Sequence, residues 1–128
     1  MVTNLLIVGV SGFFGSIARY SVYLFFSSKQ WTTFPWATLF VNVLGCLLIG
    51  FGGNLVEQAV LHHRQILLIG CVGFLGAFTT FSAFGFETIQ FIRSQQFHLA
   101  MANVLANLSL GFVAVILGIR CAHLYTKL

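Results

Sequence analysis

Four long runs of apolar residues, separated by short polar connectors, constrain this chain more than any motif that it carries. The runs cover about residues 4–26, 36–56, 66–92 and 99–125. A bilayer core about 30 Å thick requires about 20 apolar residues per helix, and each run meets that length. Because the chain is 59% hydrophobic and only 6% charged, it lacks the polar surface of a soluble domain. We predict an all-α integral membrane protein, with residues 1–128 forming one domain of four transmembrane helices in the lipid bilayer.

The remaining composition excludes several functions. The net charge of +4 comes from basic residues that are scattered singly, so no basic stripe indicates nucleic-acid binding. The cysteines Cys46, Cys71 and Cys121 each lie inside an apolar run, where we interpret them as small buried side chains. The N-terminus has no charged segment or cleavage site of a secretory signal, so we expect the first run to stay in the mature protein.

The basic residues near the ends of the runs are divided almost evenly between the two sides of the predicted membrane. One side holds Arg64, Lys127 and, slightly deeper, Arg120, whereas the other holds Lys29 and Arg93. Since an excess of Lys and Arg on one side sets the topology, this balance favours insertion in both orientations. We therefore predict that the chain can pair as an antiparallel homodimer. The sequence assigns no role to Lys29.

The third run is longer than a bilayer requires, and its centre contains residues that weaken a helix. An unbroken helix over residues 66–92 would be about 40 Å long. Gly76 and the Thr-Thr pair that begins at Thr79 disfavour the helix in the segment GAFTT. We predict a break there, in the middle of the membrane, that frees the backbone carbonyls of Gly76 and Thr79. Free carbonyls in a dry environment suit a bound Na⁺.

Arg19 lies well inside the first run, where an ionised side chain costs at least about 2.5–3.5 kcal/mol. Two interpretations remain equally open. The guanidinium either faces a cavity or a partner, or its long stem reaches a nearby interface. In the first case Arg19 would make an aqueous vestibule attractive to anions.

Neutral polar side chains recur along the second and fourth runs. Asn42 lies in the second run with Thr38 one turn earlier, and Asn103, Asn107 and Ser109 lie in the fourth. For any one of them, interhelical hydrogen bonding worth about 0.6–2 kcal/mol is the simpler interpretation. Together they form a track of donors without an acid, which suits an anion that sheds its water.

Phe78, Phe81 and Phe84 recur every third residue, so one helical face carries their rings. Packing against lipid or against the protein core is the usual role of such a stripe. The edge of a phenyl ring is also electropositive, and ring edges can solvate a small anion while they repel cations. Ser82 adds a hydroxyl donor between two of these rings.

Glu87 is the only acid that falls clearly within a predicted helix core. It could exchange protons in a transporter, cap the far end of the third helix, or hydrogen-bond across a dimer, and the sequence does not separate these roles. Small residues such as the pairs Gly12–Ser16 and Gly111–Gly118 indicate close helix packing and no particular chemistry.

Three segments, in this order along the chain, resemble the signature of the small fluoride channels of the Fluc or CrcB family. They are GVSGFFGSIARY (9–20), LFVNVLGCLLIG (39–50) and GFLGAFTTFSAF (73–84). The resemblance extends over essentially the whole chain, in length and in four-span layout, and indicates a bacterial member. It implies an antiparallel, dual-topology homodimer with two fluoride pores and a broken third helix.

The resemblance also implies roles for residues of the third run. The backbone carbonyls of Gly76 and Thr79 correspond to those that hold one central Na⁺ between the two subunits. That ion is structural and is not transported. Phe81 and Phe84 correspond to the rings whose edges line the pore, and each pore is expected to draw rings from both subunits.

Other residues match the family pattern in part. Asn42 corresponds to the pore-lining Asn, and Arg19 to the Arg of the first helix. Relatives usually have a Tyr and, four residues later, a Ser in the fourth span, where this chain has Asn103 and Asn107. Whether Asn103, Asn107 or Ser109 contacts the ion therefore stays open.

Together these features predict a passive channel, not an enzyme, that exports toxic fluoride across the inner membrane of a bacterium. One alternative is a proton-coupled exporter of the small multidrug type, in which Glu87 would exchange protons. A second alternative is a membrane anchor for a cofactor such as haem, which would need histidines within the spans. The four histidines lie instead near connectors and ends, at His62, His63, His98 and His123.

Overall fold

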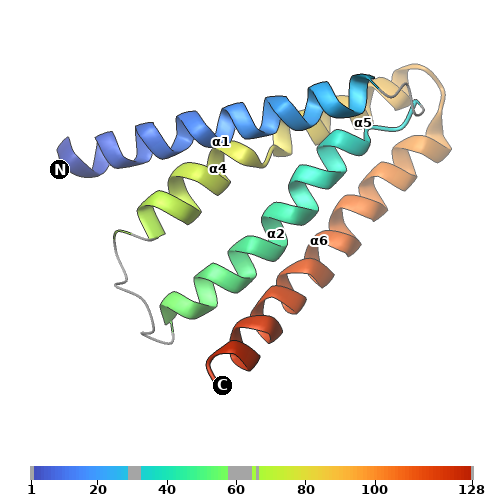
Figure 1. Ribbon diagram of the computed structural model, residues 1–128. Helices are drawn as coiled ribbons and strands as arrows, with labels where there is room; N and C mark the ends of the chain where they lie inside the picture. Colours follow the sequence, from blue (N-terminus) through green and yellow to red (C-terminus); the bar gives the residue numbers. More distant parts are fainter. Residues whose placement is uncertain (1, 29–32, 58–64, 66, 128) are drawn as a thin grey trace.

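The computed structural model describes residues 2–28, 33–57, 65 and 67–127, and the elements within these ranges are all helices (Figure 1). In chain order they are α1 (Val2–Ser28), α2 (Trp36–Glu57), the π-helical segment η1 (Leu67–Leu75), α4 (Gly76–Phe78), α5 (Phe81–Arg93) and α6 (Phe97–Tyr125). Lys29 and Arg64, which enter the predicted charge balance, lie outside the described residues.

Four stretches are long and apolar enough to cross a membrane. They are Val2–Ser28, Trp36–Glu57, Ile69–Arg93 and Phe97–Tyr125. The prediction of an all-α protein with four spans is therefore confirmed, and the chain is a multi-pass membrane protein. The first, second and fourth helices extend slightly past the apolar runs, because the polar residues at their ends remain helical.

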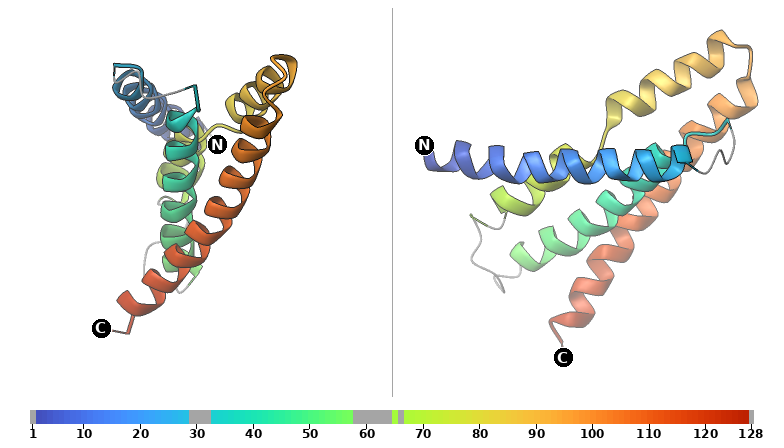
Figure 2. Two further views of the ribbon diagram at one scale, coloured as in Figure 1. Left: turned by 90° about the vertical axis from the view of Figure 1, so that its right-hand side faces the viewer. Right: turned by 45° about the horizontal axis from the view of Figure 1, so that its top comes forward.

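The helices pack in two main groups. α2 packs most extensively against α6, and α1 packs against η1. After α5 the chain turns, and the first part of α6 runs back antiparallel to α5. This pair of helices diverges from α1 (Figure 2). The helices consequently splay apart at one end and do not close into a bundle (Figure 2).

Glycines allow the two main groups of helices to approach closely. A Cβ atom added at Gly118 of α6 would lie 2.7 Å from the backbone nitrogen of Phe51 in α2. A Cβ atom at Gly15 of α1 would lie 3.0 Å from the backbone carbon of Phe74 in η1. The close helix packing expected from the small residues is therefore present within one chain.

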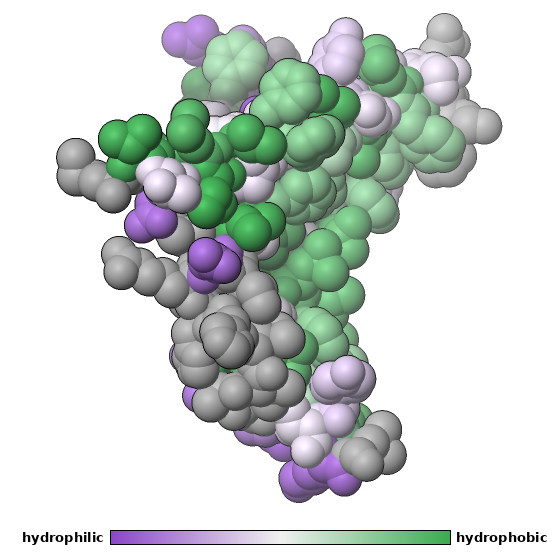
Figure 3. All heavy atoms as spheres, turned by 60° about the vertical axis from the view of Figure 1, so that its left-hand side comes forward, coloured by the Kyte–Doolittle hydropathy of each residue, from purple (hydrophilic) through white to green (hydrophobic). Residues whose placement is uncertain are grey.

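The buried core is small, and most of the outer surface is apolar. Val41 of α2, Leu75 and Phe78 form a buried cluster where α2 meets η1 and α4. Large apolar side chains are exposed along α1 and α6, and Figure 3 shows apolar residues over most of the helical surface on one side. In a membrane such a surface faces lipid or another copy of the chain, because neither requires polar groups.

Gly50 and Gly53 of α2 provide a matched pair for testing this packing. A Cβ atom at Gly50 would lie 3.1 Å from backbone atoms of Val115 in α6, whereas a Cβ atom at Gly53 has no atom within 4 Å. We expect Gly50→Ala to separate α2 from α6 and to destabilise the protein by about 1–3 kcal/mol. Gly53→Ala should leave stability unchanged or raise it by up to about 1 kcal/mol. Thermal unfolding in detergent measures both, and equal midpoints would contradict the packing.

Candidate functional site

The third span is interrupted at Thr79 and Thr80, between α4 and α5. The backbone is extended at both residues, with φ −83° and ψ 161° at Thr79 and φ −153° and ψ 107° at Thr80. β-Branched side chains favour this geometry over the helix. Thr80 also caps α5, because its Oγ1 accepts a hydrogen bond from the Ala83 N–H at 3.2 Å. The interruption lies within the segment GAFTT, and its depth in the membrane remains a prediction.

Asn42 of α2 replaces the helical partners of the backbone at the break. Its Oδ1 accepts a hydrogen bond from the Thr80 N–H at 2.9 Å, and its Nδ2 donates to the Thr80 C=O at 3.2 Å. A primary amide carries a donor and an acceptor side by side, as a peptide group does. Both backbone groups of Thr80 are therefore satisfied without water, which a break within a membrane requires.

The break leaves two carbonyls without their helical donors. In an unbroken helix the Thr80 N–H would bond the Gly76 C=O, and the Ala83 N–H would bond the Thr79 C=O. Both N–H groups donate instead to side-chain oxygens. The Arg19 guanidinium of α1 reaches the Thr79 C=O, with Nη1 3.4 Å from the oxygen. Carbonyl oxygens are the ligands of Na⁺ at broken membrane helices, so the residues present fit that ion.

Asn42 continues into a row of amides on α6. Its Nδ2 also donates to Asn107 Oδ1 at 3.0 Å, and Asn107 Nδ2 donates to Asn103 Oδ1 at 2.9 Å. Asn103 Nδ2 donates in turn to the hydroxyl of Thr88 on α5 at 3.0 Å. Both asparagines of α6 are buried. These residues of the predicted polar track are therefore contiguous, and they are joined by interhelical hydrogen bonds.

A cavity of about 340 Å³ brings together six of the predicted site residues. Those six are Asn42, Gly76, Thr79, Phe81, Phe84 and Asn107. The rings of Phe81 and Phe84 lie 5.4 Å apart between centroids, at an angle of 58°. Phe84 is buried, whereas Phe81 is 79% exposed and projects from the protein. The cavity thus places amide groups and phenyl rings beside the residues of the break, Gly76 and Thr79.

A second, more polar pocket lies against the other part of the break. It has a volume of about 320 Å³ and is lined by Ser16, Arg19, Tyr20, Tyr23, Thr80 and Ala83. Arg19 in this pocket has a protein partner in the Thr79 carbonyl. This arrangement favours the interpretation in which the guanidinium faces a cavity over the one in which it reaches an interface.

Thr38 and Glu87 belong to a separate hydrogen-bonded group. The fully buried Thr38 hydroxyl donates to Glu87 Oε1 at 2.5 Å and also pairs with the Tyr23 hydroxyl at 2.6 Å. The second carboxyl oxygen of Glu87 is buried and has no hydrogen-bond partner among the described residues. Although Thr38 lies one turn from Asn42, its side chain bonds to α1 and α5 and not to the amide row.

The two serines of the predicted site lie apart from the cavity. Ser82 is exposed, and its hydroxyl pairs with that of Thr80 at 3.2 Å. Ser109 is exposed on α6, two residues beyond Asn107. Neither lines the cavity beside the rings in this single chain.

Two residues of the site were not singled out from the sequence: Tyr23 lies in the polar pocket, and Thr88 ends the amide row. Thr80 was noted only as a residue that weakens the helix, and not for the hydrogen bonds by which it holds the break. Tyr23 follows Arg19 by four residues, so their shared helical face could have indicated a common pocket. Thr88 is a polar residue within an apolar run, and only its tertiary partners distinguish it.

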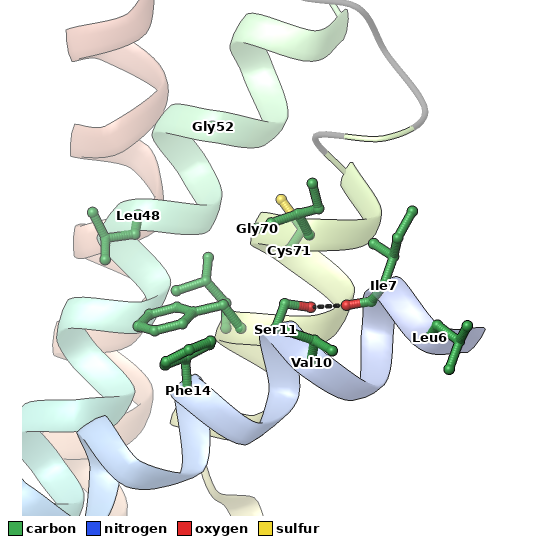
Figure 4. Close-up of a pocket in the computed structure, with 12 residues that line it drawn as sticks. Leu6, Ile7, Val10, Ser11, Phe14, Leu48, Gly52, Gly70 and Cys71 are labelled. Atoms are coloured by element: carbon green, nitrogen blue, oxygen red, sulfur yellow. Dashed lines mark hydrogen bonds between the residues drawn. The ribbon is translucent and has the colours of Figure 1, made fainter. Parts of the chain in front are cut away.

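A larger cavity, of about 760 Å³, is a poor candidate for an ion site. It lies between α1, α2 and η1, and Figure 4 shows that its labelled residues are mostly apolar, including Leu6, Val10 and Phe14. The hydroxyl of Ser11 points back to its own helix and donates to the Ile7 C=O at 2.7 Å. The cavity therefore offers no free hydroxyl donor to an anion.

Residues 6–119 match the model of a family described as CrcB-like protein, camphor resistance (CrcB). The chain belongs to the CrcB family. The proteins similar to this CrcB member include the fluoride-specific ion channel FluC of Nitrosococcus oceani. The two sequences are 38% identical over 91% of this chain and 94% of the length of the relative. FluC of Solibacter usitatus is 39% identical over 92% of this chain and 97% of its own length. FluC of Geobacter sulfurreducens is 37% identical over 94% of this chain and 98% of its own length.

The CrcB match contains the whole of the candidate site. The break at Thr79, the brace from Asn42 and the pocket of Arg19 all fall within residues 6–119. The amide row on α6 also falls within it, so the site belongs to the part of the chain that is shared with the CrcB family.

We expect the brace between Asn42 and Thr80 to stabilise this CrcB protein measurably. Asn42→Ala leaves both backbone groups of Thr80 without a partner, at a cost of about 1–3 kcal/mol each. The thermal unfolding midpoint in detergent should fall clearly. Asn4→Ala, at the start of α1 and remote from the break, provides the control. Identical midpoints for both variants would contradict a bracing role for Asn42.

Proposed function

We propose that the chain is a fluoride-selective channel that passively exports fluoride from the bacterial cytoplasm across the inner membrane. Its similar relatives are named fluoride-specific ion channels, and the chain is 38% identical to one of them over 91% of its length. The observation that carries the proposal is the cavity in which amides and phenyl rings meet. It presents ring edges to an anion beside two carboxamides, and no carboxylate lines it to bind a cation.

In this proposal fluoride enters from the pocket of Arg19, whose positive charge attracts it. It then loses water as polar groups near Thr80 and Asn42 replace its hydration shell. The Asn42 amide already donates to Thr80 and to Asn107, so a contact with fluoride requires that one of these acceptors be displaced. The ion then passes the edges of Phe81 and Phe84. Chloride, which is larger, fits this passage less well.

The channel is proposed to be an antiparallel, dual-topology homodimer with two pores. The ring of Phe81 is 79% exposed in the single chain, although it lies beside the buried Phe84. A second copy would cover this ring and would bring its own rings to the same passage. Gly76 and Thr79 line the same open cavity, so a second copy that covers it would approach the break.

A structural Na⁺ is proposed at the centre of that dimer. The backbone carbonyls of Gly76 and Thr79 would hold it, because both lack their helical donors. When bound, the ion supplies a positive charge that offsets these carbonyl dipoles. Arg19 already donates to the Thr79 C=O, so this oxygen would accept a hydrogen bond from the guanidinium and also coordinate the Na⁺.

The alternatives fit this site less well. A proton-coupled exporter would need Glu87 to face the transported cation, yet its Oε1 is bonded to Thr38 and the residue does not line the ring cavity. A haem anchor would need histidines within the spans. His98 and His123 are exposed near the ends of α6, and His62 and His63 lie outside the described residues. Since the similar relatives are named ion channels, no enzymatic activity is proposed.

The ring-edge role can be tested by flux. Purified protein in liposomes should release fluoride to an electrode much faster than chloride. We expect Phe81→Ile and Phe84→Ile each to lower fluoride efflux by at least about tenfold, because an aliphatic side chain has no electropositive edge. Phe112→Ile, at an exposed position on α6, is the matched control. Dimers should persist in all three variants, and unchanged efflux in both ring variants would exclude the role.

The Na⁺ site can be tested by a readout that does not depend on flux. A ligand that binds only the folded state stabilises it by about 2.7 kcal/mol at a hundred times its Kd. Replacing Na⁺ with N-methylglucamine at equal ionic strength should therefore lower both the unfolding midpoint and the dimer fraction. If midpoint and dimer fraction are the same with and without Na⁺, the carbonyl site does not bind the ion.

A further inference from the structure

We propose that Thr88, Asn103 and Asn107 act as positioning residues, which fix the Asn42 carboxamide and the ring-bearing turns of α5. They form a continuous hydrogen-bonded chain that runs from the backbone of Thr80 to α5. We call these residues, from Asn42 through Asn107 and Asn103 to Thr88, the amide chain. Its consequence for anion selectivity rests on the function proposed above, whereas its effect on the structure does not.

The amide chain has one direction throughout. Asn42 Nδ2 donates to Asn107 Oδ1 at 3.0 Å, Asn107 Nδ2 to Asn103 Oδ1 at 2.9 Å, and Asn103 Nδ2 to Thr88 Oγ1 at 3.0 Å. The Thr88 hydroxyl then donates to the Phe84 C=O at 2.8 Å. Every member accepts with its oxygen and donates onward, so each bond polarises the next.

The asparagines of α6 have few donors left for an ion. Asn107 Nδ2 donates to both Oδ1 and the backbone C=O of Asn103, at 2.9 and 3.0 Å. Asn103 is fully buried, and Asn107 is 9% exposed. An anion that took a hydrogen from Asn107 would leave a buried oxygen of Asn103 without a donor, which costs about 1–3 kcal/mol. This accounting favours a positioning role over direct contact with the ion.

The direction of the amide chain determines which way the Asn42 carboxamide faces. Asn42 must present its Nδ2 to Asn107 Oδ1, and its Oδ1 is then aligned with the Thr80 N–H. A carboxamide rotated by half a turn would set oxygen against oxygen at Asn107 and N–H against N–H at Thr80. The chain therefore opposes rotation of the side chain that braces the break.

The other end of the amide chain holds the turn that carries the rings. Thr88 bonds the backbone of Phe84, the buried ring of the cavity, while Asn42 bonds the backbone of Thr80 just before Phe81. The segment from Thr80 to Thr88 is thus fastened at both ends by one network. A fixed spacing between amide and rings discriminates a small anion from a larger one, so loosening the chain should reduce selectivity.

Thr88→Val tests this proposal, because valine has the shape of threonine without the hydroxyl. With asparagine side chains labelled with ¹⁵N, NMR reports each carboxamide separately. We expect the signals of Asn103, Asn107 and Asn42 to shift in Thr88→Val and to stay in place in Thr88→Ser. Thr126→Val removes a similar hydroxyl bond, to the His123 C=O at the end of α6, and is the matched control. A shift confined to Asn103 would overturn the proposal.

Flux measurements test the consequence for selectivity. Thr88→Val should lower the ratio of fluoride to chloride efflux by about tenfold, and Thr88→Ser should restore it. A wild-type ratio in Thr88→Val, alongside normal fluoride efflux in the wild type, would overturn the link between the amide chain and selectivity. If the wild type carries no fluoride, the proposed function fails, and the NMR shifts still decide whether the amide chain positions Asn42.

Discussion

The site depends on the exchange of hydrogen bonds between the Asn42 carboxamide and the backbone of Thr80. A helix interrupted within a membrane has polar groups that lipid cannot satisfy, and each one left without a partner costs several kcal/mol. Asn42 supplies both an acceptor and a donor at a single position. Because it takes the N–H that Gly76 would otherwise receive, the brace also creates the freed carbonyl. One hydrogen bond, from the Thr80 N–H to Asn42, therefore both stabilises the break and frees the Gly76 carbonyl.

The brace separates two environments of opposite character. On one side Arg19 and two tyrosines line a polar pocket, and on the other Asn107 and the rings line a mostly apolar cavity. Thr80 contributes to the first, and its neighbour Thr79 to the second. An anion that moves between them passes from a region where charge attracts it to one where only dipoles and ring edges do. In the low dielectric of the second region those weaker groups act strongly.

The sequence predicts the spans well, because hydrophobicity and length alone decide them. It also predicts an interruption near Thr79, since local propensity is weak there. The hydrogen-bond partners of the polar residues depend on tertiary structure and could not be predicted from the sequence. Thr38 and Asn42 share a helical face, yet one bonds Glu87 and the other Thr80, 38 residues away along the chain. The π-helical geometry of η1 has no evident signal in an apolar run, where every residue suits several helical forms.

The one-way order of the amide chain has a further effect. Each carboxamide is an electric dipole, and from Asn42 to Thr88 these dipoles add rather than cancel. A lone copy would thus carry a small permanent field, so its conductance would differ between the two directions across the membrane. In the proposed antiparallel pair, the second copy carries the same dipoles reversed. The pair as a whole would therefore conduct fluoride equally well in both directions, and only the electrochemical gradient of fluoride would distinguish export from import.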